Sequence, residues 1–176
     1  MKKVYDTINQ YCVEHELLTN GDGIVIGLSG GMDSVCLLQV LAALRNEWQL
    51  RLVCVHVHHG IRGTAADEDA AFAQRLAAKY NISFRLYEMD IPQLAKEQGL
   101  SEEEAGRNYR YRCFEEVRKE LNFDKIAVAH HRDDQAETVL WQILRGSGLR
   151  GVCGMRAGRA NIIRPLLCLD RQQIEQ

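Results

Sequence analysis

Short apolar runs alternate along this chain with longer segments of helical periodicity. The runs cover residues 24–28, 50–57, 83–87, 125–129 and 161–163, and several are rich in β-branched side chains. The intervening segments predict helices over residues 2–18, 34–45, 64–80, 101–121 and 133–145. This alternation predicts an α/β fold, a parallel sheet flanked by helices on both faces in three αβα layers. A length of 176 residues suits one domain with one core.

Unusual residues follow three of the predicted strands. They occupy residues 29–34 after the first strand, 56–62 after the second and 130–137 after the fourth. Ligands of parallel sheets bind outside the carboxyl ends of the strands, so these three segments should meet at one edge. We therefore expect a binding site there.

The first of these segments is rich in glycine and hydroxyl groups. Two glycines allow backbone N–H groups to approach an anion, and the following helix adds positive potential. The segment lacks the lysine of a Walker A loop and the spacing of a Rossmann fingerprint. A plain glycine turn capped by Ser34 is the simpler alternative. The candidate anion-binding residues are Ser29, Gly30, Gly31, Met32, Asp33 and Ser34.

Composition and charge narrow the class of protein. No apolar run resembles a signal peptide or is long enough to cross a bilayer, so we expect a cytoplasmic protein without a membrane partner. The net charge of −2 means that a nucleic acid would need a local basic patch or another part of the protein. The six cysteines contain no C-x-x-C pair and fit reduced, buried thiols. We expect no structural metal on the histidines.

The string S-G-G-x-D-S, residues 29–34, resembles the signature of the N-type ATP pyrophosphatases. The resemblance implies that Ser29, Gly30, Gly31 and Ser34 hold the pyrophosphate part of ATP. It also implies that Asp33 helps to hold Mg²⁺ on the phosphates, which suits the preference of this ion for carboxylate and phosphate oxygens.

Further segments narrow the resemblance to the tRNA(Ile)-lysidine synthetase family. They are residues 56–62, 104–111, 129–138 with 144–149, and 163–167, so the similarity spans residues 24–174. It implies an adenine nucleotide alpha hydrolase-like fold that uses ATP, Mg²⁺, L-lysine and tRNA(Ile) with a CAU anticodon. The family continues past its R-P-L-L segment. Residues 1–176 are thus expected to form a truncated catalytic domain without the C-terminal tRNA-binding domains.

Members of that family replace the C2 oxygen of the wobble cytidine by the ε-amine of lysine. The resemblance makes Arg110 and Asp33 the catalytic candidates, with the Arg110 guanidinium clamping phosphate. It makes His130, Asp134 and Glu137 the residues that hold lysine. Two alternatives remain open: the arginines at 107, 110 and 112 form a solvated helix face, or D-x-x-E is a capping box. In the second case Asp133 could cap the helix and leave Asp134 available.

Other functions also fit parts of the sequence. A tRNA cytidine thiolase belongs to the same superfamily, although that enzyme type relies on C-x-x-C cysteines. A glutamine-dependent synthetase domain would require a glutaminase partner. An inactive nucleotide-binding fragment is the non-enzymatic alternative.

Overall fold

Six strands form a mostly parallel sheet in the computed structural model, which describes residues 2–58, 64–146 and 153–175. The sheet order is β3-β2-β1-β4-β6-β5. The strands are β1 (Gly23–Gly27), β2 (Arg51–His58), β3 (Ser83–Glu88), β4 (Lys125–Ala127), β5 (Gly158–Arg159) and β6 (Ile162–Ile163). The predicted parallel sheet is confirmed for the pairs from β3 to β6.

The edge strand β5 departs from the prediction because it runs antiparallel to β6. Ala160 and Asn161 connect the two strands, and Ala160 has a left-handed φ of 51°. A two-residue connection can join only antiparallel strands, since a parallel neighbour needs a long crossover.

The helices include α1 (Lys2–Glu14), α2 (Met32–Leu44), α3 (Thr64–Lys79), α5 (Glu102–Glu120), α6 (Arg132–Leu144), a short 3-10 helix η1 (Pro165–Cys168) and α8 (Arg171–Ile174). The five predicted helices, α1, α2, α3, α5 and α6, lie close to their predicted positions, whereas η1 and α8 near the end of the chain were not predicted. The sequence reading also missed α4 (Ile91–Gln98). Its signals were present, because the Asp90 side chain accepts a hydrogen bond from Gln93 N at 3.0 Å and Gly99 ends the helix at φ 67°.

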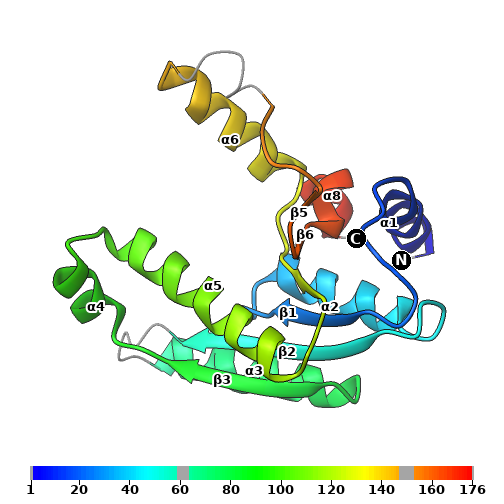
Figure 1. Cartoon of the computed structure of the whole chain (residues 1–176), viewed down its shortest axis with the longest axis horizontal. Helices are drawn as coiled ribbons and strands as arrows, with labels where there is room; N and C mark the ends of the chain where they lie inside the picture. Colours follow the sequence, from blue (N-terminus) through cyan, green and yellow to red (C-terminus); the bar gives the residue numbers. More distant parts are fainter. Residues whose placement is uncertain (1, 59–63, 147–152, 176) are drawn as a thin grey trace.

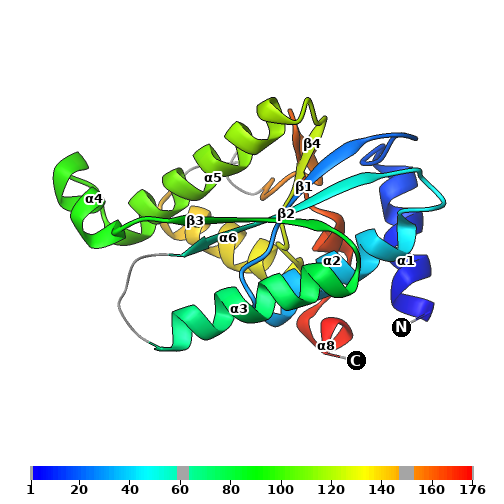
Figure 2. The same cartoon turned by 90° about the horizontal axis from the view of Figure 1, so that it is seen from below.

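Helices cover both faces of the sheet, as expected (Figure 2). Ile24 and Ile26 of β1 pack with α1, α2 and α3, whereas Val25 between them packs with α5. Helix α5 lies unusually close to β1 at Gly27, where an added Cβ would stand 2.7 Å from Phe114 Cζ. This close packing brings the arginines of α5 toward the carboxyl end of β1.

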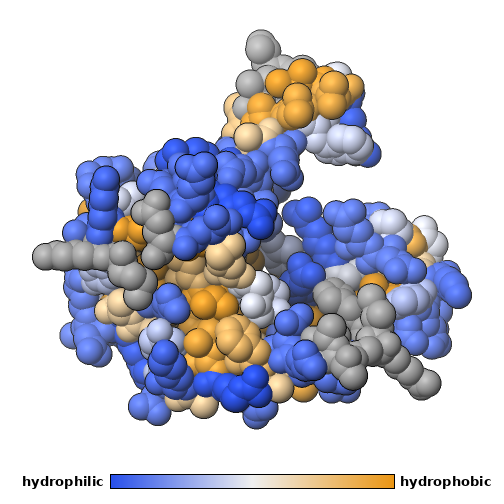
Figure 3. Space-filling model, turned by 180° about the vertical axis from the view of Figure 1, so that it is seen from behind, coloured by the Kyte–Doolittle hydropathy of each residue, from blue (hydrophilic) through white to orange (hydrophobic). Residues whose placement is uncertain are grey.

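Helix α6 does not cover the sheet but projects from it (Figure 1). It has no buried residue, and its apolar side chains are largely exposed: Leu140 58%, Trp141 57%, Ile143 54% and Leu144 72%. Figure 3 shows this apolar surface on the projecting part of the molecule. None of the helices in the described part of the chain is long and apolar enough to cross a membrane.

Candidate functional site

The glycine loop, residues 29–34, joins β1 to α2 and is held in shape by its own serines. Ser34 Oγ donates to Gly31 O at 2.7 Å and accepts from Ser29 N at 3.2 Å. Ser29 Oγ donates to Ser34 Oγ at 3.1 Å, and Gly30 adopts a φ of 92° that favours glycine. The hydroxyl hydrogen of Ser34 is therefore used within the loop, and both serines line the neighbouring cavity.

Helix α2 begins at Met32, two residues earlier than predicted, so Asp33 lies in its first turn. Gly31 is the N-cap residue in extended conformation, and no side chain within the described part of the chain caps this end. Free N–H groups at a helix N-terminus attract anions through hydrogen bonding and the helix dipole. The loop thus combines an anion cradle with a carboxylate at its rim.

A half-open cavity of about 810 Å³ lies beside this loop, at the carboxyl ends of β1, β2 and β4. Of the predicted site residues, Ser29, Gly31, Asp33, Ser34, Arg110 and His130 line it. Gly30, Met32, Asp134 and Glu137 lie outside its lining. The sequence reading missed several other lining residues: Asp69, Glu102, Glu103, Arg107 and Tyr111. Asp69 sits within the acidic stretch 67–69, where only the fold distinguishes it from its neighbours.

Arginines of α5 supply positive charge to the cavity. Arg107 and Arg110, one helical turn apart, both line it, whereas Arg112 lies over the Tyr109 ring at 4.9 Å. The Arg110 side chain is reached by solvent in the cavity, yet the surrounding protein desolvates it and lowers its pKa. The alternative of a solvated helix face therefore fits Arg112 better than Arg110.

A buried histidine forms part of the cavity wall. His56 Nδ1 lies 2.7 Å from Leu28 O, and because a carbonyl only accepts, Nδ1 carries the hydrogen. Burial lowers the pKa of His56 below its ordinary value. A neutral ring with Nε2 as an acceptor follows, which suits contact with a hydrogen-bond donor of a bound ligand.

His130, which follows β4, is a second histidine that lines the cavity. Burial lowers its pKa first, and the nearby charge of Arg164 adds to this effect. Its Nδ1 is buried without a hydrogen-bond partner in the part of the chain that the structure describes. Arg164 itself is only 8% exposed and donates to Arg156 O at 3.0 Å. The ring is therefore neutral near pH 7 and holds one buried polar nitrogen for a ligand.

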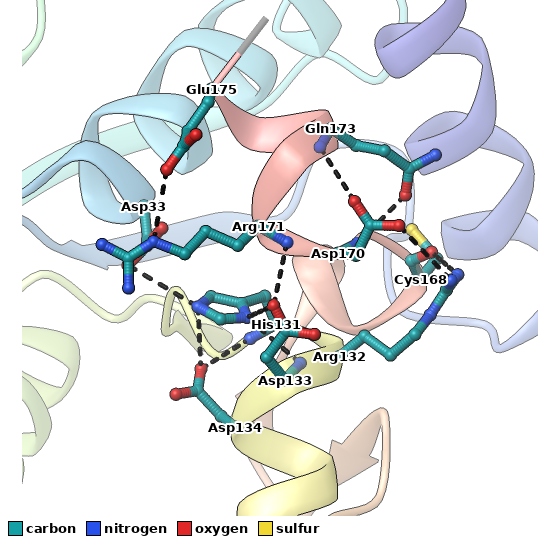
Figure 4. Close-up of polar contacts among 10 residues, drawn as sticks. All are labelled: Asp33, His131, Arg132, Asp133, Asp134, Cys168, Asp170, Arg171, Gln173 and Glu175. Carbon is teal, nitrogen blue, oxygen red and sulfur yellow. Dashed lines mark hydrogen bonds and ion pairs between the residues drawn. The ribbon is translucent and has the colours of Figure 1, made fainter.

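The N-terminus of α6 is capped by His131, not by Asp133 or Asp134 as predicted. His131 Nδ1 accepts from Asp133 N at 3.2 Å, and Asp134 Oδ2 accepts from His131 N at 2.9 Å. Asp133 Oδ2 instead accepts from Arg171 N at 3.1 Å (Figure 4). The idea that Asp133 caps and frees Asp134 is thus wrong, because the ring of His131, two residues earlier, accepts from the N–H of Asp133 itself.

His131 brings the glycine loop and α6 together. Its side chain is 7% exposed, and Nε2 lies 3.8 Å from Asp33 Oδ2 and 3.6 Å from Asp134 Oδ2 (Figure 4). Glu137 follows Asp134 by three residues on α6 and is exposed. Two of the predicted acidic site residues, from separate segments, therefore converge on one nitrogen.

The chain's own groups could hold a metal ion only with help from a ligand. Within the described residues, no group of three or more histidine, cysteine, aspartate or glutamate side chains could bind one. Asp33 Oδ1, however, is buried without a hydrogen-bond partner among those residues. A lone buried carboxylate oxygen beside an anion cradle fits a cation that phosphate oxygens also coordinate.

The expectation of buried thiols holds for Cys12, Cys54 and Cys113, whereas Cys36 and Cys168 are partly buried and Cys153 is exposed. Burial raises the pKa of Cys12 and of Cys54 to about 12, and that of Cys168 to about 11. A thiol with such a pKa is a poor nucleophile at neutral pH.

Comparisons with known proteins identify the family to which the chain is similar. The PP-loop domain family matches residues 2–176. The tRNA(Ile)-lysidine synthase of Caldanaerobacter subterraneus subsp. tengcongensis is 48% identical over 176 residues, which are 100% of this chain and 37% of that protein. The tRNA(Ile)-lysidine synthase of Clostridium tetani is 42% identical over 173 residues, 98% of this chain and 36% of that protein. The chain thus spans little more than a third of these relatives.

Solved structures resemble the fold at lower identity. The U34-tRNA thiolase NcsA from Methanococcus maripaludis, with its 4Fe-4S cluster, superposes with a TM-score of 0.77 at 20% identity, covering 99% of this chain and 61% of that one. The NH3-dependent NAD synthetase from Campylobacter jejuni gives a TM-score of 0.62 at 18% identity, covering 98% of this chain and 69% of that one. At such identities the likeness concerns the fold.

Proposed function

This chain belongs to the PP-loop domain family, and from that premise we propose that it is the catalytic domain of a tRNA(Ile)-lysidine synthase. The proposed reaction is the ATP-dependent ligation of L-lysine to C2 of the wobble cytidine of tRNA(Ile), with release of pyrophosphate and AMP. The proposal draws on two relatives, 48% and 42% identical, that bear this name.

One observation carries the proposal most directly. Asp33 of the glycine loop and Asp134 of α6 both lie within 4 Å of His131 Nε2, at 3.8 and 3.6 Å. A carboxylate beside the phosphate cradle is therefore close to one that could bind an ammonium group. A ligase that activates one substrate with ATP and then joins it to an amine needs this proximity.

In the first step, the C2 oxygen of cytidine attacks the α-phosphorus of ATP and pyrophosphate leaves. The glycine loop would bind the departing phosphates through backbone N–H groups, and Arg110 would face them across the cavity. A guanidinium stays ionised even when desolvation lowers its pKa, so Arg110 retains the charge that this role needs. Mg²⁺, held by Asp33 and the phosphates, would neutralise negative charge as it develops.

In the second step, the ε-amine of lysine attacks C2 and AMP leaves with the former C2 oxygen. We propose that Asp134 and Glu137, on one side of α6, bind the ammonium groups of lysine. Neutral His130 would add a hydrogen bond from the end of β4. One of these groups must take a proton before the amine attacks, and a carboxylate at hydrogen-bond distance is suited to that task.

Most of the tRNA contacts are proposed to come from elsewhere in the protein. The net charge of this chain is −2, and the lysidine synthases that it resembles extend well beyond the matched region. A protein that binds tRNA tightly normally neutralises several phosphates with arginine and lysine side chains. We place this reaction in the cytoplasm, where tRNA is modified before use.

The thiolase alternative is less well supported by the chemistry of the thiols. Sulfur transfer requires a nucleophilic thiolate, whereas burial raises the pKa of Cys12, Cys54 and Cys168 to about 11 or 12. Residue Cys153 is exposed, but it stands apart from any C-x-x-C spacing.

Acceptor choice tests the proposed function. The protein is incubated with Mg²⁺, ATP and a tRNA(Ile) transcript bearing a CAU anticodon, and AMP release is measured with lysine, sulfide or ammonia. We expect AMP and lysidine to appear only with lysine, and the Asp33→Asn variant to lose AMP formation while melting within about 2 °C of the wild type. Preferential use of sulfide or ammonia would overturn the proposal.

A further inference from the structure

The carboxylates of Asp33 and Asp134 belong to different segments, and a single ring lies between them (Figure 4). Asp33 is in the first turn of α2, after β1, whereas Asp134 is in the first turn of α6, after β4. We propose that His131 is a positioning residue that sets these two carboxylates relative to each other, and so aligns the ATP side of the site with the acceptor side. The functional consequence rests on the proposed ligase reaction.

The hydrogen bonds of the ring determine where its proton lies. Nδ1 accepts from the backbone N–H of Asp133 at 3.2 Å as part of the helix cap. An imidazole nitrogen that accepts cannot also carry a hydrogen, so the neutral ring is protonated at Nε2. The cap therefore fixes the tautomer, and the tautomer places an N–H donor at Nε2.

That donor faces both carboxylates at comparable distances. Nε2 is 3.6 Å from Asp134 Oδ2 and 3.8 Å from Asp33 Oδ2. Both distances are longer than a hydrogen bond. The N–H lies near both carboxylates without a hydrogen bond to either, and its positive end offsets the repulsion between them. A small rotation of either side chain closes a charge-assisted hydrogen bond.

The ring has little freedom to leave this position. The side chain is 7% exposed, and the backbone N–H of the same residue donates to Asp134 Oδ2 at 2.9 Å. The other carboxylate of the first turn, Asp133, accepts a hydrogen bond from Arg171 N. His131 thus acts on the reaction through Asp33 and Asp134, and its two nitrogens have separable tasks.

Two substitutions separate those tasks. In His131→Asn, the amide oxygen can replace Nδ1 as the acceptor of the cap, but nothing replaces the Nε2 donor. In His131→Gln, the amide nitrogen can reach the Nε2 position, but the acceptor at the δ position is lost. Melting temperature and the rate of lysidine formation are measured for both variants and for the wild type, together with the Mg²⁺ concentration for half-maximal rate.

We expect stability to depend on Nδ1, which caps the helix, and activity to depend on Nε2, which faces the carboxylates. His131→Asn should melt within about 2 °C of the wild type, because asparagine is a favoured N-cap residue. Its kcat should nevertheless fall by about tenfold, as for the loss of a hydrogen bond to a charged group, with a higher Mg²⁺ requirement. His131→Gln should melt lower but retain more activity below its melting temperature.

Two outcomes would overturn the inference. One is wild-type kcat and Mg²⁺ dependence in His131→Asn, which would leave His131 only as a helix cap. The other is a loss of activity in both variants that merely parallels their loss of stability. A wild-type protein that forms no lysidine contradicts the proposed function instead, and the two failures are therefore distinguishable.

Discussion

Asp134 takes part in the cap of helix α6 and is proposed to bind lysine, and replacing it by asparagine should separate these two roles. Its Oδ2 accepts from His131 N at 2.9 Å, and its side chain is 37% exposed at the end of the helix that carries Glu137. In Asp134→Asn the amide oxygen keeps the capping bond, so only the charge–dipole attraction is lost, about 0.5 kcal/mol. That corresponds to a melting temperature about 1–2 °C lower. Asp134→Ala also loses the hydrogen bond and should cost about 1–1.5 kcal/mol in total.

The catalytic effect of the same change should be larger than its effect on stability. A carboxylate–ammonium hydrogen bond contributes about 1.5–3 kcal/mol, and the partial exposure of Asp134 favours the lower end of that range. The KM for lysine should therefore rise about 10- to 30-fold, since about 1.4 kcal/mol equals a factor of ten. ATP–pyrophosphate exchange with tRNA but without lysine should stay within about twofold of wild type, because the charge that binds phosphate is untouched.

Asp133→Asn is the matched control for this prediction. Asp133 lies in the same turn, is 50% exposed and accepts from Arg171 N at 3.1 Å, so its loss should affect stability but leave the lysine KM unchanged. The reasoning is refuted if Asp134→Asn lowers pyrophosphate exchange as much as lysine transfer. It is refuted equally if both asparagine variants raise the lysine KM alike.

Two further predictions concern stability and tRNA binding. Arg118 holds Glu115 through two hydrogen bonds of 2.8 Å and lowers the pKa of that carboxyl from 4.5 to about 2. The ionised carboxylate therefore stabilises the fold fully above pH 4.5 and less as the pH falls toward 2. Glu115→Gln should cost about 1 kcal/mol at pH 7 by urea unfolding, and equal differences at pH 7 and pH 3 would contradict this. The 176-residue chain should bind tRNA weakly through the exposed Arg145, Arg156 and Arg159. Its affinity should fall about thirtyfold between 50 and 200 mM salt, and tight binding selective for tRNA(Ile) in a fluorescence titration would disprove this.

The sequence could predict the parts of the fold that rest on local pattern. Strands β1 and β2 are apolar runs rich in β-branched residues, and β3 and β4 are short segments between predicted helices, so their positions could be read from local pattern. Helix α4 was missed because it spans only eight residues and follows β3 after a short connection, although Asp90 and Pro92 mark its start. The short β5 has no periodic pattern to detect, and its direction depends on the turn at residues 160–161.

The candidate site divides in a similar way. The glycine loop could be found because its residues are contiguous and chemically unusual. The cavity-lining Asp69 and the cap His131 could not be identified, because their roles depend on distances across the fold. Asp69, for example, lies next to Gly30: a Cβ added to Gly30 would be 3.5 Å from the Cβ of Asp69. Nothing within residues 67–69 indicates which acidic side chain reaches the loop.

Polar contacts of its first turn explain how α6 can serve a reaction without packing on the sheet. Arg132 N donates to Leu169 O at 2.8 Å, and Asp133 accepts from Arg171 N. Gln135 completes the attachment with a pair of bonds to the backbone of Met155, at 3.0 Å to its oxygen and 2.6 Å from its nitrogen. These contacts all lie in the turn that contains Asp134, whereas the apolar side chains farther along the helix are exposed. The helix is therefore fixed where the carboxylate must be placed to within a fraction of an ångström, since misplaced groups lose much of their catalytic effect. Anchoring by hydrogen bonds at one end thus orients the proposed lysine-binding carboxylate without requiring a buried helix face.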